Sequence, residues 1–195
     1  VASSATEKQS GHLGPGGSEG YELFDRINVE DTAREAARIA VTMLGAKPCP
    51  AGKIPVVIDN GFGGVIFHEA CGNGLEATAV ARNASVFAGR LGQQIASPLV
   101  TALDDGTIPN GWGSAEMDDE GTPTAKNILI ENGILRSYLV DRLNSRRMHT
   151  AITGSSRRQD YRFAPTSRMT NTFIANGKST PEEIIANTEF GLYAK

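Results

Sequence analysis

The feature that most constrains the fold is a hairpin signal in the second half of the chain. The segment "NILIENGILRSYLVD" places Asn132 and Gly133 between two runs rich in Ile and Leu. An Asn-Gly pair favours the left-handed backbone of a tight turn between antiparallel strands. Because "PLVTALDDG" and "MTNTFIAN" are also strand-like, we predict a mostly antiparallel sheet in this half.

Helix signals flank these strands. "NVEDTAREAARIAVTMLG" predicts a helix that Asn28 caps and that ends at Gly45, where a left-handed residue is common. "RLNSRRMH" indicates a short helix, and Thr180 with Glu183 predicts a capping box. "PVVIDN", residues 55–60, predicts a short buried strand. The predicted fold class is therefore α+β, with a mostly antiparallel sheet, barrel-like or curled, and a few flanking helices.

Two segments lack a regular pattern. Residues 1–20 are rich in Gly and Ser without an apolar period, which predicts a flexible arm or linker. Residues 150–168, "TAITGSSRRQDYRFAPTSR", look too irregular for a packed element. The chain begins at Val1 without a methionine and stops abruptly at "EFGLYAK", so we expect a piece of a longer polypeptide.

Composition narrows the function classes. A net charge of -3, with no dominant basic run, argues against nucleic-acid binding. The apolar stretches are shorter than the roughly 20 residues of a membrane span. Two cysteines, Cys49 and Cys71, are too few for a disulfide framework. No signal peptide precedes the first helix pattern. We therefore expect a cytoplasmic protein that binds neither nucleic acid nor membrane.

The stretch "GGVIFHEACGNGLEAT", residues 63–78, carries the strongest chemical signal and admits three interpretations. A phosphate cradle would need Gly-x-Gly-x-x-Gly, but Ile66 occupies the last glycine position and the P-loop Gly-Lys-Ser/Thr is absent. His68 and Glu69 could instead form an ordinary satisfied polar pair. The third interpretation is a metal site on a helix.

The spacing of a metal site here would be unusual. Zinc peptidases commonly place two His four residues apart, roughly 40° around the helix, but position 72 is Gly. Asn73 lies five residues after His68, roughly 140° away on an ideal helix. An inserted residue, as in a π-bulge, would close that gap, and Gly72 and Gly74 would ease the distortion.

Several segments together resemble one family. "FHEACGNGLEA" resembles the His-Glu-x-x-x-His segment of the TldD/PmbA metallopeptidases, also described as modulators of DNA gyrase. "VFAGRLGQQIASPLVTALDDGTIP", "DDEGTPT", "SRMTNT" and "PEEIIANTEFGLYA" are similar to family sequence as well, from about residue 20 onward. The resemblance implies a zinc peptidase that cleaves unfolded or short peptides inside a homodimer or a heterodimer with a paralogous subunit. Residues 21–195 would be part of its catalytic domain, without the family's N-terminal domain and C-terminal end.

The resemblance also assigns roles to individual residues. His68 matches the first zinc ligand, Glu69 matches the general base, and Asn73 stands at the position of the second His ligand. The family's cysteine ligand has no counterpart here. Since an amide oxygen is a poorer zinc ligand than imidazole, we expect weakly held zinc and slow or absent cleavage. Cys71 and Glu76 are possible outer partners of the ion, although Cys71 could simply pack as a small apolar residue and Glu76 could lie on the surface.

A second hypothesis is a non-catalytic partner subunit that stabilises a dimer or presents substrate. The loss of His at position 73 favours it, whereas the retention of His68 and Glu69 favours the peptidase. The substrate-binding residues stay unassigned. The sequence also contains a cluster of arginines, which could form a solvated or dimer-facing loop or could bind substrate carboxylates. Its members are Arg157, Arg158, Arg162 and Arg168. "MTNTFIAN" could pair through its edge with an extended peptide.

Overall fold

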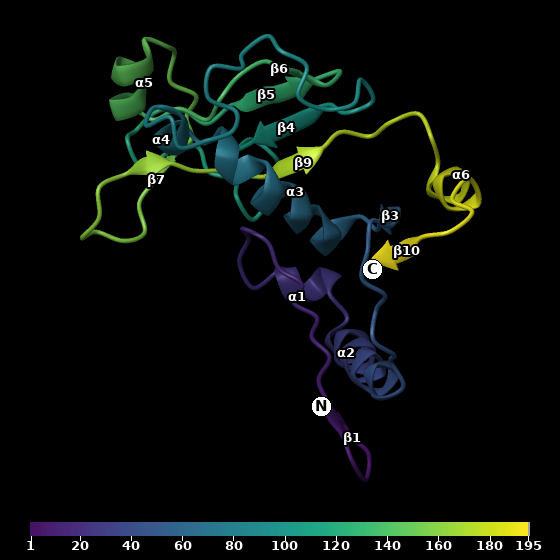
Figure 1. Cartoon of the computed structure of the whole chain (residues 1–195). Helices are drawn as coiled ribbons and strands as arrows, with labels where there is room; N and C mark the ends of the chain where they lie inside the picture. The colour runs from purple at the N-terminus through teal and green to yellow at the C-terminus, as the bar shows by residue number, and fades with distance from the viewer. Residues whose placement is uncertain (195) are drawn as a thin grey trace. The chain divides into compact units, whose positions relative to one another are not determined.

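The computed structural model describes residues 1–194, apart from the side chain of Phe62, and divides into two compact units that meet between Lys53 and Ile54. The first unit contains β1 (Ala2–Ser3), β2 (Lys8–Gln9), α1 (Leu23–Arg26) and α2 (Val29–Leu44). Strands β1 and β2 form an antiparallel hairpin that packs on α2 (Figure 1). The segment that we predicted as a flexible arm therefore includes a short hairpin beside a helix.

Helix α2 begins as the sequence predicts and ends differently. The side chain of Asn28 accepts a hydrogen bond from the backbone N–H of Asp31 at 3.1 Å, which confirms the predicted cap. Gly45 has φ of -99°, so the predicted left-handed end is wrong. Its N–H instead bonds to the carbonyl of Thr42 at 3.1 Å, which closes the helix with a tightened last turn.

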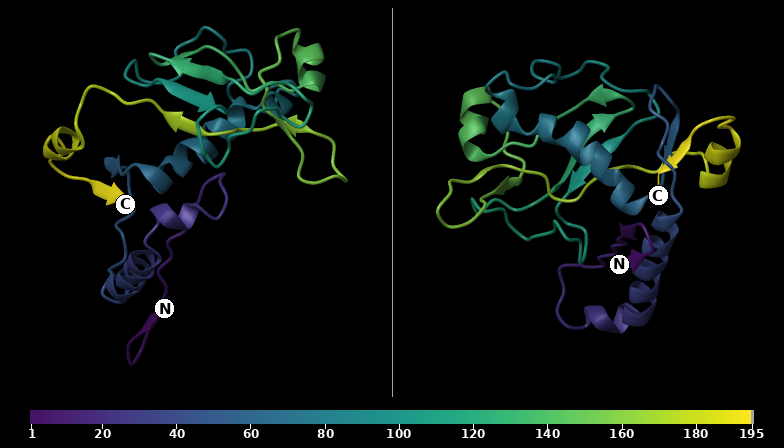
Figure 2. Two further views of the ribbon diagram at one scale, coloured as in Figure 1. Left: turned by 180° about the vertical axis from the view of Figure 1, so that it is seen from behind. Right: turned by 60° about the horizontal axis from the view of Figure 1, so that its bottom comes forward.

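The second unit is built around a four-stranded antiparallel sheet in the order β6–β5–β4–β9 (Figures 1 and 2). Its strands are β4 (Ala102–Asp105), β5 (Lys126–Glu131), β6 (Ile134–Leu135) and β9 (Thr172–Ile174). Asn132 and Gly133 have φ of 49° and 80°, which confirms the predicted tight turn between β5 and β6. The sheet is open, with β6 and β9 at its edges, so the barrel-like alternative is corrected.

Shorter elements surround this sheet. They are β3 (Val56–Ile58), the 3-10 helix η1 (Gly61–Gly64), α3 (Val65–Ala70), the 3-10 helix η2 (Gly72–Leu75), α4 (Ala77–Val80), α5 (Arg142–Met148), β7 (Ser156–Arg157), β8 (Thr166–Ser167), α6 (Pro181–Ala186) and β10 (Leu192–Ala194). Helix α3 lies beside β9 in all views (Figures 1 and 2). Strand β3 pairs in parallel with β10, and Val56 and Ile58 are 49% and 41% exposed, so the prediction of a buried strand is wrong.

Two further predictions have clear outcomes. Thr180 caps α6, and Glu183 accepts a bond from the Thr180 N–H at 2.9 Å, which confirms the capping box. The segment 150–168, predicted to be too irregular to pack, forms the antiparallel hairpin β7–β8. Its serines Ser155 and Ser156 are only 2% and 3% exposed. The hairpin is ordered by long-range bonds, such as Asp119 N–H to Ser156 O at 3.0 Å, that no local pattern reveals.

One apolar core underlies the sheet and the helices that cover it. Its largest fully buried apolar side chains are Leu75, Leu129, Ile130, Leu135, Leu139 and Met169. Leu75 follows the His-Glu helix and Met169 precedes β9, so the core joins the candidate site to the sheet. Each such side chain contributes about 1.5–3 kcal/mol when it is removed from water.

Candidate functional site

The helix that carries the predicted site is anchored by one aromatic residue. Phe67 is 8% exposed and belongs to the apolar core. Because successive helical residues point about 100° apart, its neighbours lie at the border of the core. His68 is half-buried and Glu69 is exposed. The structure therefore holds the imidazole and the carboxylate on a fixed helix, with both side chains reachable from solvent.

Helix α3 ends immediately after these two residues. Cys71 has φ of -123° and ψ of -49°, and its N–H bonds to the carbonyl of Phe67 at 3.0 Å. The chain then winds as the 3-10 helix η2. The π-bulge considered from the sequence is not observed in this described segment. A break followed by a tighter turn, with about three residues per turn, takes its place.

Position 72 has no room for a side chain. Gly72 is buried, and a Cβ atom there would overlap with Sδ of Met169. In the common zinc-peptidase spacing this position carries the second His. A side chain at position 72 would therefore require Met169 to move, and Asn73, the next position along the chain, presents the polar side chain instead.

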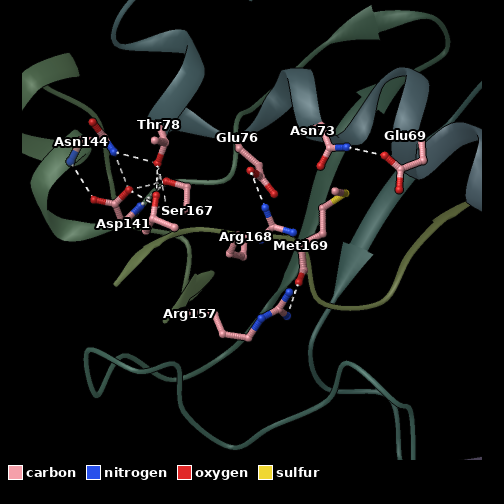
Figure 3. Close-up of polar contacts among 11 residues, drawn as sticks. Glu69, Asn73, Glu76, Thr78, Asp141, Asn144, Arg157, Ser167, Arg168 and Met169 are labelled. Atoms are coloured by element: carbon pink, nitrogen blue, oxygen red, sulfur yellow. Dashed lines mark hydrogen bonds and ion pairs between the residues drawn. The ribbon is translucent and has the colours of Figure 1, made fainter. Parts of the chain in front are cut away.

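Asn73 meets Glu69. Its Nδ2 atom donates a hydrogen bond to Oε2 of Glu69 at 2.8 Å (Figure 3). The two residues are four apart, a spacing at which side chains of neighbouring turns can touch. The predicted general base is thus engaged by the amide that replaces the second imidazole. This contact is the central geometric fact of the candidate site.

The donor set does not fit a catalytic zinc ion. Such an ion takes three protein ligands and one water. Among residues 1–194, no group of three or more His, Cys, Asp or Glu side chains converges as a metal site. Cys71 is half-buried against the core, and burial raises the pKa of its thiol, which disfavours the thiolate that binds metals. His68 is therefore the strongest candidate ligand that this segment offers.

Glu76 is not a surface residue, contrary to the simpler sequence expectation. It is 8% exposed, and its Oε2 lies 3.5 Å from Nη1 of Arg168 (Figure 3). Burial raises the pKa of Glu76, and the positive charge of Arg168 opposes that shift. Its Oε1 is buried without a hydrogen-bond partner in the described part of the chain. Glu76 is consequently the buried member of an ion pair beside the site, whose other member, Arg168, is partly exposed.

Sequence reasoning missed a buried polar network beside this ion pair. Asp141 is 1% exposed and accepts bonds from Asn144 Nδ2 at 2.6 Å and from the Ser167 N–H at 3.0 Å (Figure 3). Burial pushes the pKa of Asp141 up, but the bonds from Ser167 and Asn144 outweigh it and leave the pKa below its ordinary value. An Asp just before a predicted helix was the available signal, since Asp141 caps α5.

The arginine cluster is partnered largely within the chain. Arg158 pairs with Asp119 at 3.7 Å, and Arg162 pairs with Asp160 at 2.8 Å. Arg157 donates from Nη1 to the Met169 carbonyl at 2.8 Å. The acidic segment "DDEGTPT" forms a turn in which Oδ1 of Asp118 accepts the N–H groups of Glu120 and Thr122.

The predicted His-Glu pair thus lies on a short helix beside an open antiparallel sheet in an α+β domain. Residues 51–195 match the family model described as the PmbA/TldA metallopeptidase C-terminal domain. The chain therefore belongs to the PmbA/TldD metallopeptidase family, as its motifs predict.

Individual proteins that are similar to this chain in sequence or structure support the same family. The chain is 43% identical to a metalloprotease TldD homolog from Buchnera aphidicola subsp. Acyrthosiphon pisum, over 96% of this chain and 40% of the relative. It is 42% identical to the TldD homolog of Haemophilus influenzae, with the same coverage. A Thermotoga maritima structure named as a proposed modulator of a DNA gyrase matches with a TM-score of 0.74 and 29% identity, over 87% of this chain and 38% of that one.

A second solved structure that the chain resembles has the name TldE. TldE from Thermococcus kodakarensis matches with a TM-score of 0.71 and 25% identity, over 86% of this chain and 38% of that one. The chain thus spans about 40% of the length of the curated relatives that it matches. Within residues 1–194, no helix has the length and apolar character that a membrane crossing requires.

Proposed function

We propose that the whole protein is a cytoplasmic TldD/PmbA-type zinc peptidase, acting on unfolded or short peptides, whose metal site is impaired by Asn73. Relatives named metalloproteases support the reaction class. His68 and Glu69 lie on a helix that Phe67 anchors in the core, and the sequence resemblance assigns them the roles of ligand and base. The hydrogen bond from Asn73 to Glu69 carries the proposed impairment.

The impairment follows from chemistry at two atoms. An amide nitrogen has no lone pair to offer a metal, and an amide oxygen is a weak zinc ligand beside imidazole. The bond at 2.8 Å also occupies Oε2 of Glu69, one of the two oxygens through which that carboxylate could accept a proton. Both effects predict weak zinc binding and a slow reaction.

The second candidate is a non-catalytic partner subunit in a dimer with a paralogous chain. The same contact favours it, because a Glu69 bonded to Asn73 has a structural role that needs no metal. The likeness to a chain named TldE, alongside the TldD relatives, is compatible with two kinds of subunit in this family. In either role, β9 at the sheet edge beside α3 is the strand that an extended peptide would meet.

The test measures zinc content and peptide cleavage in the whole protein and in its Asn73→His variant. Under the peptidase proposal, the variant gains stoichiometric zinc and cleavage rises from little or nothing to a clear rate. Adding Glu69→Gln to that variant should then abolish cleavage while zinc is retained. Asn187→His, an exposed exchange at the end of α6, is the matched control and should change neither property.

Two other results decide against the impairment. Substantial cleavage with Asn73 in place would show that the amide does not disable the site. Absence of zinc and cleavage in both forms would leave the partner-subunit proposal, which then predicts that cleavage appears only after addition of a paralogous subunit.

A further inference from the structure

A cavity of about 90 Å³ lies next to the candidate site, between the acidic turn and the β7–β8 hairpin. Its walls include Asp118, Ser156, Arg157, Arg168 and Met169. Met169 is shared with the candidate site, since its sulfur packs against Gly72 while its carbonyl accepts the Arg157 bond (Figure 3). A cavity of this size holds several waters or one small polar group.

One wall of the cavity presents an unused hydrogen-bonding group. Ser156 is 3% exposed, and its hydroxyl is buried without a partner in the described part of the chain. A buried hydroxyl left unpaired costs about 1–3 kcal/mol. The backbone of Ser156 is engaged, with its N–H bonded to Asp118 Oδ2 at 3.1 Å and its carbonyl to the Asp119 N–H. The hydroxyl is therefore the polar group of this wall residue that has no hydrogen-bond partner among the described residues.

Two guanidinium groups line the same cavity. Arg168 contacts Glu76 through Nη1 at 3.5 Å, and Arg157 uses Nη1 for the Met169 carbonyl. A guanidinium has five N–H donors, so each arginine has further N–H groups beyond those in the contacts above. Figure 3 shows the two groups on the same side of the candidate site, both next to Met169. Arginine forks and a hydroxyl are the donors that recognise an oxyanion.

The acidic residues in the wall select among oxyanions. The carboxylate of Asp118 already accepts three backbone N–H groups, from Glu120, Thr122 and Ser156. Asp119 accepts the N–H of Arg158 at 2.7 Å. These bonds spread but do not cancel the negative charges, which repel a phosphate dianion more strongly than a single carboxylate. A monoanionic carboxylate therefore suits the cavity better than phosphate.

We propose that this cavity is a carboxylate-binding subsite, formed by Arg157, Arg168 and the Ser156 hydroxyl. Its ligand is either the C-terminal carboxylate of a peptide or a free small carboxylic acid, which share this chemistry. The proposal concerns binding alone, so its outcome is separate from that of zinc-dependent cleavage.

The test is calorimetric titration of the whole protein with three probes: an N-acetylated tripeptide acid, its C-terminal amide, and acetate. The acid should bind at least about tenfold more tightly than the amide, because the amide cannot form charge-assisted bonds. Arg157→Gln should weaken acid binding about tenfold and leave amide binding unchanged. Arg162→Gln, an arginine outside the cavity wall that pairs with Asp160, is its matched control and should have no effect.

The hydroxyl is tested separately. Ser156→Ala should weaken acid binding about threefold to tenfold, since one hydrogen bond to a charged group is lost. Thr122→Val also removes a buried unpaired hydroxyl, but outside the cavity wall, and should leave binding unchanged. Thermal unfolding of each variant establishes that it is folded before its binding is compared.

The titrations distinguish a peptide C-terminus from a free small acid as the ligand, and they can also show that the cavity binds neither. Tight binding of the peptide acid with much weaker acetate identifies a peptide C-terminus. Equal binding of both, abolished in Arg157→Gln, identifies a free small acid. Equal affinity for peptide acid and peptide amide overturns the subsite, as does binding that Arg157→Gln and Ser156→Ala leave unchanged.

Discussion

Sδ of Met169 occupies the space in which a side chain at Gly72 would begin. Met169 is 1% exposed and lies on the segment that enters β9, whereas Gly72 opens the 3-10 turn after the His-Glu helix. This contact joins the candidate site to the sheet across 97 positions of sequence, from 72 to 169. It also fixes where the chain turns between Glu69 and Asn73.

Gly72→Ala should therefore destabilise the protein by about 1–3 kcal/mol, the range for overpacking a closed core. Met169→Ala opens that space at a cost of about 2–5 kcal/mol. The double variant should be more stable than the sum of the two effects by at least about 1 kcal/mol, because the methyl group introduced at position 72 then has room. Denaturant unfolding of the four proteins measures this coupling.

A glycine in the same region provides the control. A Cβ atom added at Gly64 would meet no other part of the structure within 4 Å, and the φ of this residue is an ordinary helical -60°. Gly64→Ala should change the free energy of unfolding by less than about 1 kcal/mol or raise it slightly. Strict additivity of Gly72→Ala and Met169→Ala would contradict the proposed contact.

Asp141 should make stability depend on acid pH. Burial raises its pKa, but bonds from Ser167 and Asn144 more than offset that effect and leave the folded pKa lowered. A depressed carboxyl pKa contributes stability that is present above the unfolded value of about 3.9 and is lost as pH falls through the folded value. Asp141→Asn should cost about 1–3 kcal/mol at neutral pH, and its deficit should shrink below about pH 4. A deficit that is constant with pH would refute the role of the charge.

Asp104 should behave in the opposite sense. It is fully buried, and burial raises its pKa although Thr172 and Thr170 donate hydrogen bonds to it. The folded state then binds the proton more tightly than the unfolded state, so stability falls as pH rises from about 3.9 to the folded pKa. Asp104→Asn removes this fall in stability. The free energy of unfolding of the variant should therefore rise relative to that of the wild type as pH increases through that window. Unfolding curves across about pH 3 to 8 would show the two carboxyl groups with slopes of opposite sign.

The sequence predicts local structure well where neighbouring residues determine it. Asn28 and Thr180 cap their helices through bonds to residues three positions on, and Asn132 and Gly133 adopt the left-handed backbone that an Asn-Gly pair favours. The family motifs likewise indicated the family. These features depend on contacts of a few residues, so a pattern in one segment contains the information.

Features that depend on distant contacts were predicted poorly. Ser156 and Glu76 were expected in irregular or exposed positions, yet both are buried because Asp119 and Arg168, far away in sequence, approach them. The break at Cys71 also escaped prediction, since it accommodates Met169 above Gly72. In the candidate site, the residue positions came from the motif, but the bond from Asn73 to Glu69 came only from the structure.

The hairpin turn that the sequence predicts also packs against the segment that precedes β4, through hydrogen bonds of Gly133. The N–H of Gly133 bonds to the Val100 carbonyl at 2.7 Å, and its own carbonyl accepts the N–H of Ile95 at 2.9 Å. A Cβ at Gly133 would overlap with the side chain of Gln94 and lie 2.6 Å from the Ser97 carbonyl. Gly121 has a similar φ, +71° against +80°, but nothing lies within 4 Å of its built Cβ.

Alanine substitution at these two glycines separates backbone strain from crowding. Gly121→Ala should cost about 1–2 kcal/mol, the penalty for a left-handed backbone with a side chain. Gly133→Ala carries the same penalty and a further cost of about 1–3 kcal/mol for displacing the loop around Gln94 and Ser97. The extra loss should appear as faster amide exchange of Ile95, whose bond to Gly133 is weakened. Equal losses at the two positions would show that the turn is held by its own geometry and not by the segment against which it packs.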